Sequence, residues 1–407
     1  MTLTGRPGSP ARRPMAMLTH SHYEEDPRVR REAESLVERG RAVDVYALRR
    51  EGEPALEVLD GVRVRRLGVE RHQGAGIGTY LREYLSFLAR AGWSVTRAHR
   101  QRRYAVVQVH TLPDFLAFGG LPVRLTGVPI LLDLHEAMPE FFRMRFPGSA
   151  SPLAHRLLLV QERASIGLAS AVITVNQALA DRLVGQGVPS SKVSVILNSP
   201  SLRRFDPSAQ PERHFMADGV LRLVYTGALT PVYELDVVIA ALAALRTRRP
   251  ELRVNLEIYG RGDAEAGLRV LVEELALGEV VRFHGRIPIA AVPGVIAAAD
   301  VGLAPTKSNR FTEMSLSTKL FEYGAMDRPI VASALPLVER TFPAGSVATY
   351  RPGDPADLGA VLLRLVDDPG AREAGVSLAR TRITELAWDH EAGRLMDLID
   401  RLAGDRP

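Results

Sequence analysis

Short apolar segments alternate with helical segments along almost the whole chain, and this alternation constrains the fold more than any other feature of the sequence. In the first half we predict strands at residues 15–20, 42–48, 62–67, 104–110, 129–135, 171–175 and 193–197. Helices are predicted between them at 28–39, 79–91, 113–125, 153–168 and from residue 177 onward. Short apolar strands that alternate with helices are typical of parallel sheets covered on both faces.

A second cycle of the same kind begins near residue 221. Its predicted strands cover 221–226, 254–259, 280–284, 301–304 and 330–332, and its predicted helices 235–248, 264–277, 289–299 and 317–325. The joint at 198–212 contains three prolines and few apolar residues, which suits a linker. The 407 residues therefore predict two doubly wound, Rossmann-like α/β domains that face a cleft, over 14–203 and 204–387, behind a disordered tail at 1–13.

The composition removes several classes of protein. The chain contains no cysteine, which excludes disulfides, thiolate metal sites and thiol nucleophiles. No stretch reaches the roughly 18 apolar residues of a membrane-spanning helix. The polar N-terminal residues include no apolar core of a secretory signal. We therefore expect a cytoplasmic protein.

The charge is unevenly distributed. Residues 1–200 carry 27 lysines and arginines against 19 aspartates and glutamates, and ten of these arginines lie between positions 63 and 103. Such a basic face attracts an acidic acceptor or an anionic membrane, or is an ordinary solvated surface. The segment 80–88, followed by Trp93, suits peripheral docking at the inner face of the membrane and equally a core-packed helix. A lipid-carrier acceptor fits the docking interpretation, and we expect no nucleic-acid partner.

Open parallel sheets bind their ligands at the carboxyl ends of the strands, so the residues that follow each strand are the candidates for function. Asp133, His135 and Glu136 come at the end of one predicted strand, where carboxylates can orient an imidazole and tune its proton affinity. Arg28 opens the helix after the first strand and can bind an anion there. No second histidine lies at helical spacing from His135, so we expect no metal site.

The second half offers an anion site. Gly227 directly follows a buried strand, where the missing side chain lets a phosphate approach the backbone. In the segment 304–325, Ser317 or Thr318 can cap a helix whose first amides attract an anion, and Lys319 adds a charge at the same end. Glu322 lies one turn further on and can accept hydrogen bonds from ribose hydroxyls. A capped surface helix is the alternative interpretation.

Several segments together resemble the retaining, nucleotide-sugar-dependent glycosyltransferases of GT-B fold, in particular their bacterial polysaccharide and natural-product "group 1" branch. The resemblance covers nearly the whole chain and is carried by residues 26–40, 133–140, 195–198, 225–229, 258–260, 283–285 and 319–325. Trp388 resembles the start of the family's last helix, which implies a helix over 388–404 that packs back on the N-terminal, acceptor-side domain.

The resemblance also implies roles for single residues. Glu322 would bind the donor ribose, and Thr318 and Lys319, beside Gly227, would hold the donor diphosphate. Residues 285–287, which are Gly285, Arg286 and Ile287, would lie against the base. His135 would approach the transferred sugar and position it.

Three positions depart from the family pattern. Ala228 and Tyr233 stand where the family places the arginine and lysine that clamp the diphosphate, and Met314 replaces the first of two glutamates. The lost cations require substitutes, and the candidates are Lys319, Arg310, Lys307 and Arg28.

The mechanism that the resemblance implies needs no protein base. The diphosphate leaves the anomeric carbon while the acceptor attacks from the same face, and the departing phosphate oxygen takes the acceptor proton. We expect no metal and no cofactor, with a nucleoside diphosphate sugar, most often of UDP or GDP, as co-substrate. The alternatives are a GT-B sugar-nucleotide epimerase, a pseudoglycosyltransferase, or a catalytically silent relative that binds a partner.

Overall fold

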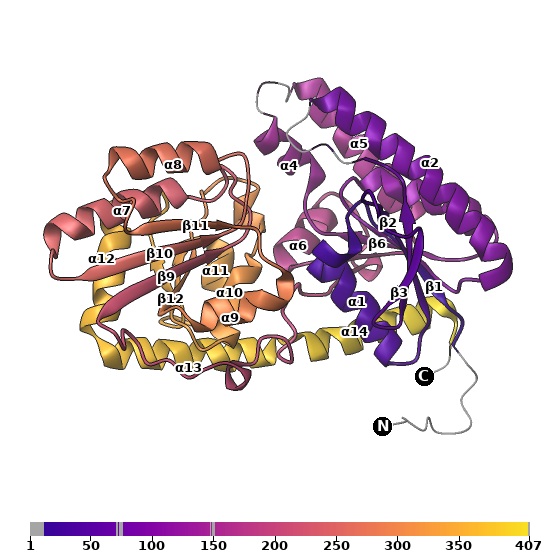
Figure 1. Ribbon diagram of the computed structural model, residues 1–407. Coiled ribbons are helices and arrows are strands. Elements are labelled where there is room, and N and C mark those ends of the chain that lie inside the picture. The colour runs from indigo at the N-terminus through magenta and orange to yellow at the C-terminus, as the bar shows by residue number, and fades with distance from the viewer. Residues whose placement is uncertain (1–11, 71, 73–75, 147, 149–150, 406–407) are drawn as a thin grey trace. The chain divides into compact units, whose positions relative to one another are not determined.

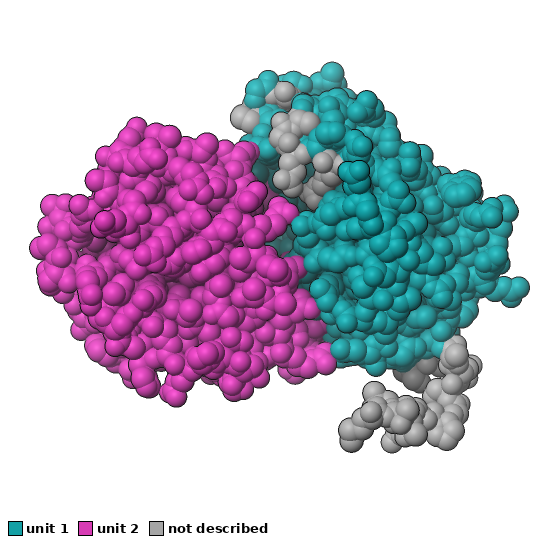
Figure 2. Space-filling model, in the orientation of Figure 1, with its two compact units in different colours: residues 1–197, 391–407 teal, residues 198–390 magenta. Residues whose placement is uncertain are grey.

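The computed structural model describes residues 12–70, 72, 76–146, 148 and 151–405. The chain divides into two compact units: unit 1 contains residues 1–197 and 391–407, and unit 2 contains residues 198–390 (Figure 2). Each unit is a Rossmann-like α/β layer structure, which confirms the predicted fold class. Of the tail predicted at 1–13, residues 1–11 lie outside the described part.

Unit 1 is built on a β-sheet with helices packed around it (Figure 1). The described residues form eight strands of this sheet, in the order β3-β4-β2-β1-β5-β6-β7-β8. The strands are β1 (Met15–Leu18), β2 (Val43–Leu48), β3 (Leu56–Leu59), β4 (Val62–Leu67), β5 (Val107–His110), β6 (Ile130–Leu134), β7 (Ala171–Thr174) and β8 (Val193–Val195). All pairs are parallel except β3 with β4. Strand order reverses at β1, and α/β sheets bind ligands at such a point.

The helices of unit 1 connect these strands. They are α1 (Pro27–Glu38), α2 (Ile77–Arg102), α3 (Leu121–Arg124), α4 (Met138–Arg145), α5 (Pro152–Leu168) and α6 (Gln177–Gly185), together with the end of α14 (Trp388–Ala403). Asp26 begins α1, since its side chain accepts a hydrogen bond from the Val29 amide at 3.1 Å and Pro27 occupies the first helical position.

Unit 2 contains a parallel sheet of six described strands in the order β11-β10-β9-β12-β13-β14. The strands are β9 (Val220–Thr226), β10 (Arg253–Tyr259), β11 (Val281–Gly285), β12 (Val301–Ala304), β13 (Ile330–Ser333) and β14 (Ala348–Tyr350). The helices are α7 (Leu235–Arg248), α8 (Glu265–Glu274), α9 (Val292–Ala297), α10 (Thr318–Ala325), α11 (Pro336–Thr341), α12 (Pro355–Asp367), α13 (Pro369–Glu385) and the first residues of α14.

Helices cover both faces of the unit 2 sheet. Leu221, Leu223 and Tyr225 of β9 pack into a core shared with α7 and α12, whereas Val224 points into a second core with α10 and α13. Side chains alternate along a strand, so a central strand with two buried faces must be apolar at nearly every position. This requirement explains why β9 is an almost continuous apolar run.

Several predicted boundaries were wrong. The helix predicted at 79–91 extends over residues 77–102, and the segment predicted as a helix at 113–125 is a 3₁₀ segment (Asp114–Gly120) followed by the single turn α3. Strand β3 was not predicted, because it pairs at the sheet edge and its apolar side chains are exposed. The chain passes between the units at residues 197–198, six residues before the expected boundary. No described helix is long and apolar enough to cross a membrane.

Candidate functional site

A cluster of ionisable side chains surrounds Asp133 at the carboxyl end of the unit 1 sheet. Strands β5 and β6 are neighbours, and their register places His110 opposite Asp133. The Oδ2 atom of Asp133 lies 3.0 Å from Nδ1 of His110 and 3.2 Å from Nε2 of His135. The backbone amide of His135 donates to Oγ1 of Thr111 at 3.1 Å, which fixes the start of the loop after β6.

Arg28 closes this cluster from α1. Its guanidinium donates two hydrogen bonds to the carboxylate of Asp133, at 2.8 and 2.9 Å, and its Nε lies 3.0 Å from Glu32. A third bond runs to the carbonyl of Ile196 at 3.3 Å. Arg28 is buried, with its donors directed at these protein acceptors. The proposed contact of Arg28 with a diphosphate is therefore not supported, because its charge is neutralised inside unit 1.

The cluster shifts the acidity of its members. Burial raises the pKa of Asp133, but Arg28 and the two histidines outweigh burial and hold this pKa well below the usual range. Burial lowers the pKa of His110, yet the hydrogen bond and charge of Asp133 reverse the effect and leave it raised. Burial raises the pKa of Glu32 in spite of Arg28. Asp133 is therefore an ionised anchor and not a proton acceptor near neutral pH.

Glu136 behaves differently from Asp133. It follows β6 and is partly exposed, but the surrounding protein desolvates its carboxyl and raises its pKa to about 7. A carboxyl with such a pKa exchanges its proton near neutral pH. Of the three residues predicted in this segment, Asp133 and His135 are in contact, and Glu136 lies beside them in sequence.

His110, Asp133 and His135 could also hold a metal ion, because one ligand atom from each lies within 4.8 Å of the others. However, both oxygens of Asp133 already accept hydrogen bonds from Arg28. A cation at this place would be opposed by the guanidinium charge. The expectation of a metal-free site thus stays a prediction.

In unit 2, strands β9, β10 and β11 each end at or directly before a glycine, and these glycines lie close together. Gly227 has φ +146° and Gly260 has φ +154°, and a Cβ on Gly260 would lie 1.7 Å from the carbonyl oxygen of Gly227. The amide of Gly260 donates to the carbonyl of Gly285 at 2.8 Å. The structure therefore brings two predicted positions, Gly227 and Gly285, to one edge of the sheet. Arg286 and Ile287 follow there, the first exposed and the second partly buried.

Lys319 lies against Gly227. A Cβ on Gly227 would approach Cε of Lys319 to 2.7 Å and its Nζ to 2.9 Å. Lys319 is only 6% exposed, and no carboxylate of the described residues forms an ion pair with it. A buried cation without a counter-charge is costly, so it requires either other protein groups or an anionic ligand.

Two aromatic rings support the ammonium group of Lys319. Its Nζ lies 4.0 Å from the ring centre of Tyr233 and 5.1 Å from that of Tyr225, within the range of cation–π attraction. The hydroxyl of Tyr225 donates to the carbonyl of Ala228 at 2.7 Å. Of the two positions that depart from the expected cation clamp, Tyr233 contacts Lys319 directly, and Ala228 contributes only the backbone carbonyl that holds the Tyr225 hydroxyl.

The first turn of α10 supplies the rest of the predicted anion site. Thr318 is its first residue, but the side chain of Ser317 makes no capping hydrogen bond, contrary to expectation. The first amides of α10 consequently lack a side-chain cap. Glu322 lies one turn after Thr318 and is partly exposed.

The two other candidate cations occupy the loop after β12. The backbone amide of Lys307 donates to the carbonyl of Val232 at 2.9 Å, which ties the loop to the segment that carries Tyr233. Arg310 is exposed. Two side chains of this loop form hydrogen bonds with its own backbone. The Oδ1 atom of Asn309 accepts from the Phe311 amide, and the hydroxyl of Thr312 donates to the carbonyl of Lys307. His110, Glu32 and Tyr225 were not predicted as site residues. Of these, only His110 could have been found from the sequence, because it is the last residue of a predicted strand.

Two Rossmann-like α/β units in one chain are the architecture of the GT-B class of fold. Residues 26–199 match the family described as glycosyl transferase 4-like domain, and residues 221–368 match glycosyl transferases group 1. The chain thus belongs to the nucleotide-sugar glycosyltransferases of GT-B fold.

Relatives and solved structures agree with this assignment. D-inositol 3-phosphate glycosyltransferases of Thermomonospora curvata and Actinosynnema mirum are 25% and 27% identical, over 90% and 89% of this chain and 88% of each relative. Sucrose-phosphate synthase from Thermosynechococcus elongatus superposes with a TM-score of 0.74 at 20% identity, over 96% of this chain and 99% of that one. Anabaena Alr3699/HepE, solved with UDP and glucose, gives 0.71 at 15% identity, over 95% and 99%.

Proposed function

We propose that this glycosyltransferase moves a hexosyl unit from a nucleoside diphosphate sugar, with UDP or GDP as the nucleotide, to an acceptor hydroxyl with retention of configuration. The observation that carries the proposal is Lys319, a buried ammonium group beside Gly227 at the start of α10. An anion bound there would receive both the lysine charge and the first-turn amides. The complex of Anabaena Alr3699/HepE with UDP and glucose supports a uridine nucleotide.

In this proposal Lys319 replaces the family's arginine and lysine. Tyr233 and Tyr225 hold its ammonium group without neutralising it, so its full charge stays available for the diphosphate. Thr318 lies at the same helix start, and Glu322 is the acceptor for the ribose hydroxyls. Lys307 and Arg310 are further cations for the diphosphate, on the neighbouring loop.

The chemical step breaks the bond between the anomeric carbon and the phosphate oxygen and forms a bond to the acceptor oxygen on the same face. The acceptor proton passes to the departing phosphate oxygen, and helix amides and Lys319 stabilise its charge. His135 positions the sugar, and Asp133, held ionised by Arg28, orients His135. Glu136 is the carboxyl that can exchange a proton near neutral pH. The reaction needs no metal.

The first test compares Lys319→Ala with Lys192→Ala, a lysine change in unit 1, by calorimetric titration with UDP and GDP. A charge-assisted contact of roughly 1.5–3 kcal/mol corresponds to a loss of affinity of about tenfold or more in Lys319→Ala only. Equal affinities in the two variants would remove Lys319 from the site. Nucleotide binding without any sugar transfer would favour the silent relative.

A second test addresses the stereochemistry and the metal. The anomeric proton of the product, followed by NMR in the presence of EDTA, reports both at once. We expect the configuration of the donor and an unchanged rate. An inverted product, or activity that EDTA abolishes and a divalent cation restores, would contradict the proposal.

We also propose that unit 1 docks peripherally on the inner face of an anionic membrane. The exposed face of α2 carries Ile77, Leu81 and Leu85 at helical spacing, and the exposed Arg82 lies beside them. Apolar and cationic side chains on one helix face favour binding to an anionic leaflet.

A further inference from the structure

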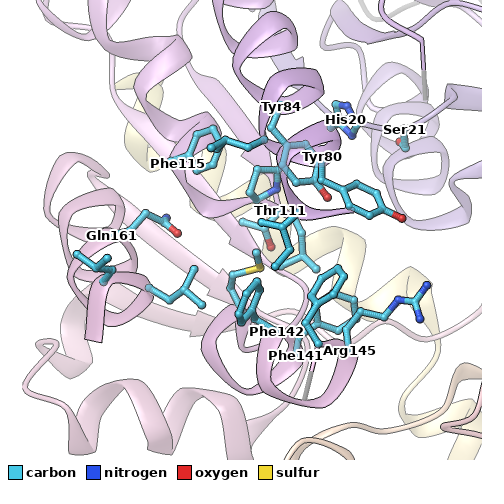
Figure 3. Close-up of a pocket in the computed structure, with 18 of the residues that line it drawn as sticks. His20, Ser21, Tyr80, Tyr84, Thr111, Phe115, Phe141, Phe142, Arg145 and Gln161 are labelled. Carbon is cyan, nitrogen blue, oxygen red and sulfur yellow. The ribbon is translucent and has the colours of Figure 1, made fainter. Parts of the chain in front are cut away.

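Unit 1 contains a cavity of about 570 Å³ beside the Asp133 cluster. Six tyrosine and phenylalanine side chains line it, from α2, α4, the residue that follows α4 and the segment after β5: Tyr80, Tyr84, Phe115, Phe141, Phe142 and Phe146. Figure 3 shows several of these rings together with Gln161 and Arg145. Its volume lies within the roughly 300–1,000 Å³ of pockets that bury small organic ligands. The apolar walls favour an apolar occupant.

Part of the cavity lining is polar, and one of these residues contacts the candidate site. Thr111 lines the cavity, and its hydroxyl accepts the hydrogen bond of the His135 amide. Ser21 and Asp26 line it too, and the hydroxyl of Ser21 donates to Asp26 at 2.8 Å. A ligand in the cavity can therefore place a hydroxyl head close to His135 while its apolar part lies among the aromatic rings.

Part of the cavity lining is apolar and also exposed at the protein surface, and we call this part the mouth. Ile77, Leu81 and Leu157 line the cavity and are nevertheless 39, 49 and 60% exposed. The exposed apolar surface continues along α2 with Leu85 and along α5 with Leu153. Contiguous exposed apolar surface at the mouth of a cavity marks an interaction site.

The exposed charges on the two helices that carry these leucines have one sign. On α2 and α5 the exposed charged side chains are all arginines: Arg82, Arg90, Arg97, Arg100, Arg156 and Arg163. The two carboxylates of these helices are buried, where Glu83 contacts His72 and Glu162 contacts Arg182. Arg82 and Arg156 adjoin the exposed Leu81 and Leu157 in sequence, so apolar and cationic side chains occur together there, which suits an anionic lipid leaflet.

We propose that the cavity binds the apolar chain of a membrane-borne lipid acceptor, whose hydroxyl head lies at Thr111 and His135. This inference rests on the proposed function and specifies its acceptor. The proposed lipid acceptor differs from the acceptor of the D-inositol 3-phosphate glycosyltransferases, whose name indicates a polar acceptor. A compact polyol phosphate needs many hydrogen-bond partners and cations, and in this cavity Arg145 is the cationic lining residue.

The test uses cis-parinaric acid, a fatty acid whose fluorescence rises in an apolar pocket, with the full-length protein. We expect saturable binding of one molecule per chain, and displacement by farnesyl phosphate but not by inositol 1-phosphate. Leu158→Trp fills the cavity and should weaken binding at least tenfold, whereas Leu378→Trp, an exposed leucine of unit 2, should leave it unchanged. If Leu158→Trp does not fold, Met138→Trp places the same bulk in the cavity.

Three results would overturn the proposal. They are the absence of saturable binding, equal affinity in Leu158→Trp and Leu378→Trp, and displacement by 4-methylumbelliferone in preference to farnesyl phosphate, which would indicate a compact aromatic acceptor. Nucleotide binding measured on the same samples reports on the donor site in unit 2. Failure of the lipid proposal is therefore distinguishable from failure of the proposed glycosyl transfer.

Discussion

At the scale of single residues, the unusual feature of the donor site is a lysine held by aromatic rings. Tyr233→Leu removes the ring that lies 4.0 Å from Nζ of Lys319, while Tyr233→Phe keeps it. A cation–π contact is worth about 0.5–2 kcal/mol, so we expect Tyr233→Leu to weaken nucleotide binding about 2- to 30-fold and Tyr233→Phe to bind as the parent does. Titration calorimetry measures both. Equal losses in the two variants would show that the hydroxyl, not the ring, matters.

Glu136 makes stability depend on pH. Its pKa of about 7 in the folded chain lies above its unfolded value, so the folded state binds the proton more tightly. The free energy of unfolding must then fall as the pH rises from about 4.5 to about 7, and Glu136→Gln should remove this part of the dependence. Urea unfolding of both proteins at pH 5, 6, 7 and 8 measures it. Parallel curves over this range would refute the raised pKa.

At the scale of elements, the buried pair of Arg28 and Asp133 joins α1 to β6. Both side chains are buried, so Asp133→Asn leaves the guanidinium without its main counter-charge. Removing one partner of a buried pair typically costs about 3–5 kcal/mol, and we expect a loss of that size in the free energy of unfolding.

An ion pair at the surface of unit 2 serves as the matched control for this buried pair. Arg269 and Glu265 form an i,i+4 pair on the surface of α8, and Arg269→Ala should cost less than about 1 kcal/mol. Chemical unfolding followed by circular dichroism measures both variants. A loss below 1 kcal/mol for Asp133→Asn would mean that water or a rearranged Glu32 replaces the pair.

The elements also show how far sequence reasoning reaches. The central strands of both sheets were predicted, since two buried faces require apolar runs. Asp133 lies at the end of one of them, β6, and Lys319 in α10, the helix between β12 and β13. The 3₁₀ segment at 114–120 was taken for a helix because its apolar residues recur at similar spacing. The aromatic contacts of Lys319 could not be predicted, because Tyr225 on β9 and Tyr233 in the segment after β9 lie far from the lysine in sequence and meet it only in the folded chain.

At the scale of the whole molecule, the charge asymmetry predicts salt-sensitive membrane binding. Co-sedimentation with vesicles that contain anionic lipid should decrease when the salt rises from about 0.1 M to about 1 M, since the screening length falls from about 10 Å to about 3 Å. Leu85→Glu should weaken binding, whereas Val270→Glu, at an exposed valine of α8, should not. Vesicle binding that does not change with the salt concentration or with the content of anionic lipid would contradict electrostatic docking.

The last helix, α14, begins in unit 2 and ends in unit 1. The chain leaves unit 2 in α14, and residues 391–407 belong to unit 1. There the fully buried Arg41 bonds Asp400 at 2.6 Å and Asp405 at 2.5 Å, and the amide of Leu197 donates to Glu391 at 2.9 Å. A helix over 388–404 was expected from the resemblance at Trp388, whereas the partners of Arg41 lie too far apart in sequence to be paired from it.

The central claim is that unit 2 binds a nucleoside diphosphate through Lys319, and thermal shifts with UDP, GDP, ADP, TDP and CMP in EDTA test it most directly. A ligand at about 100 times its dissociation constant stabilises a protein by roughly 2.7 kcal/mol, which raises the melting temperature measurably. We predict a selective shift from UDP or GDP that is lost in Lys319→Ala and kept in Lys192→Ala. No shift from any nucleotide, or a shift of equal size in Lys319→Ala, would contradict the account.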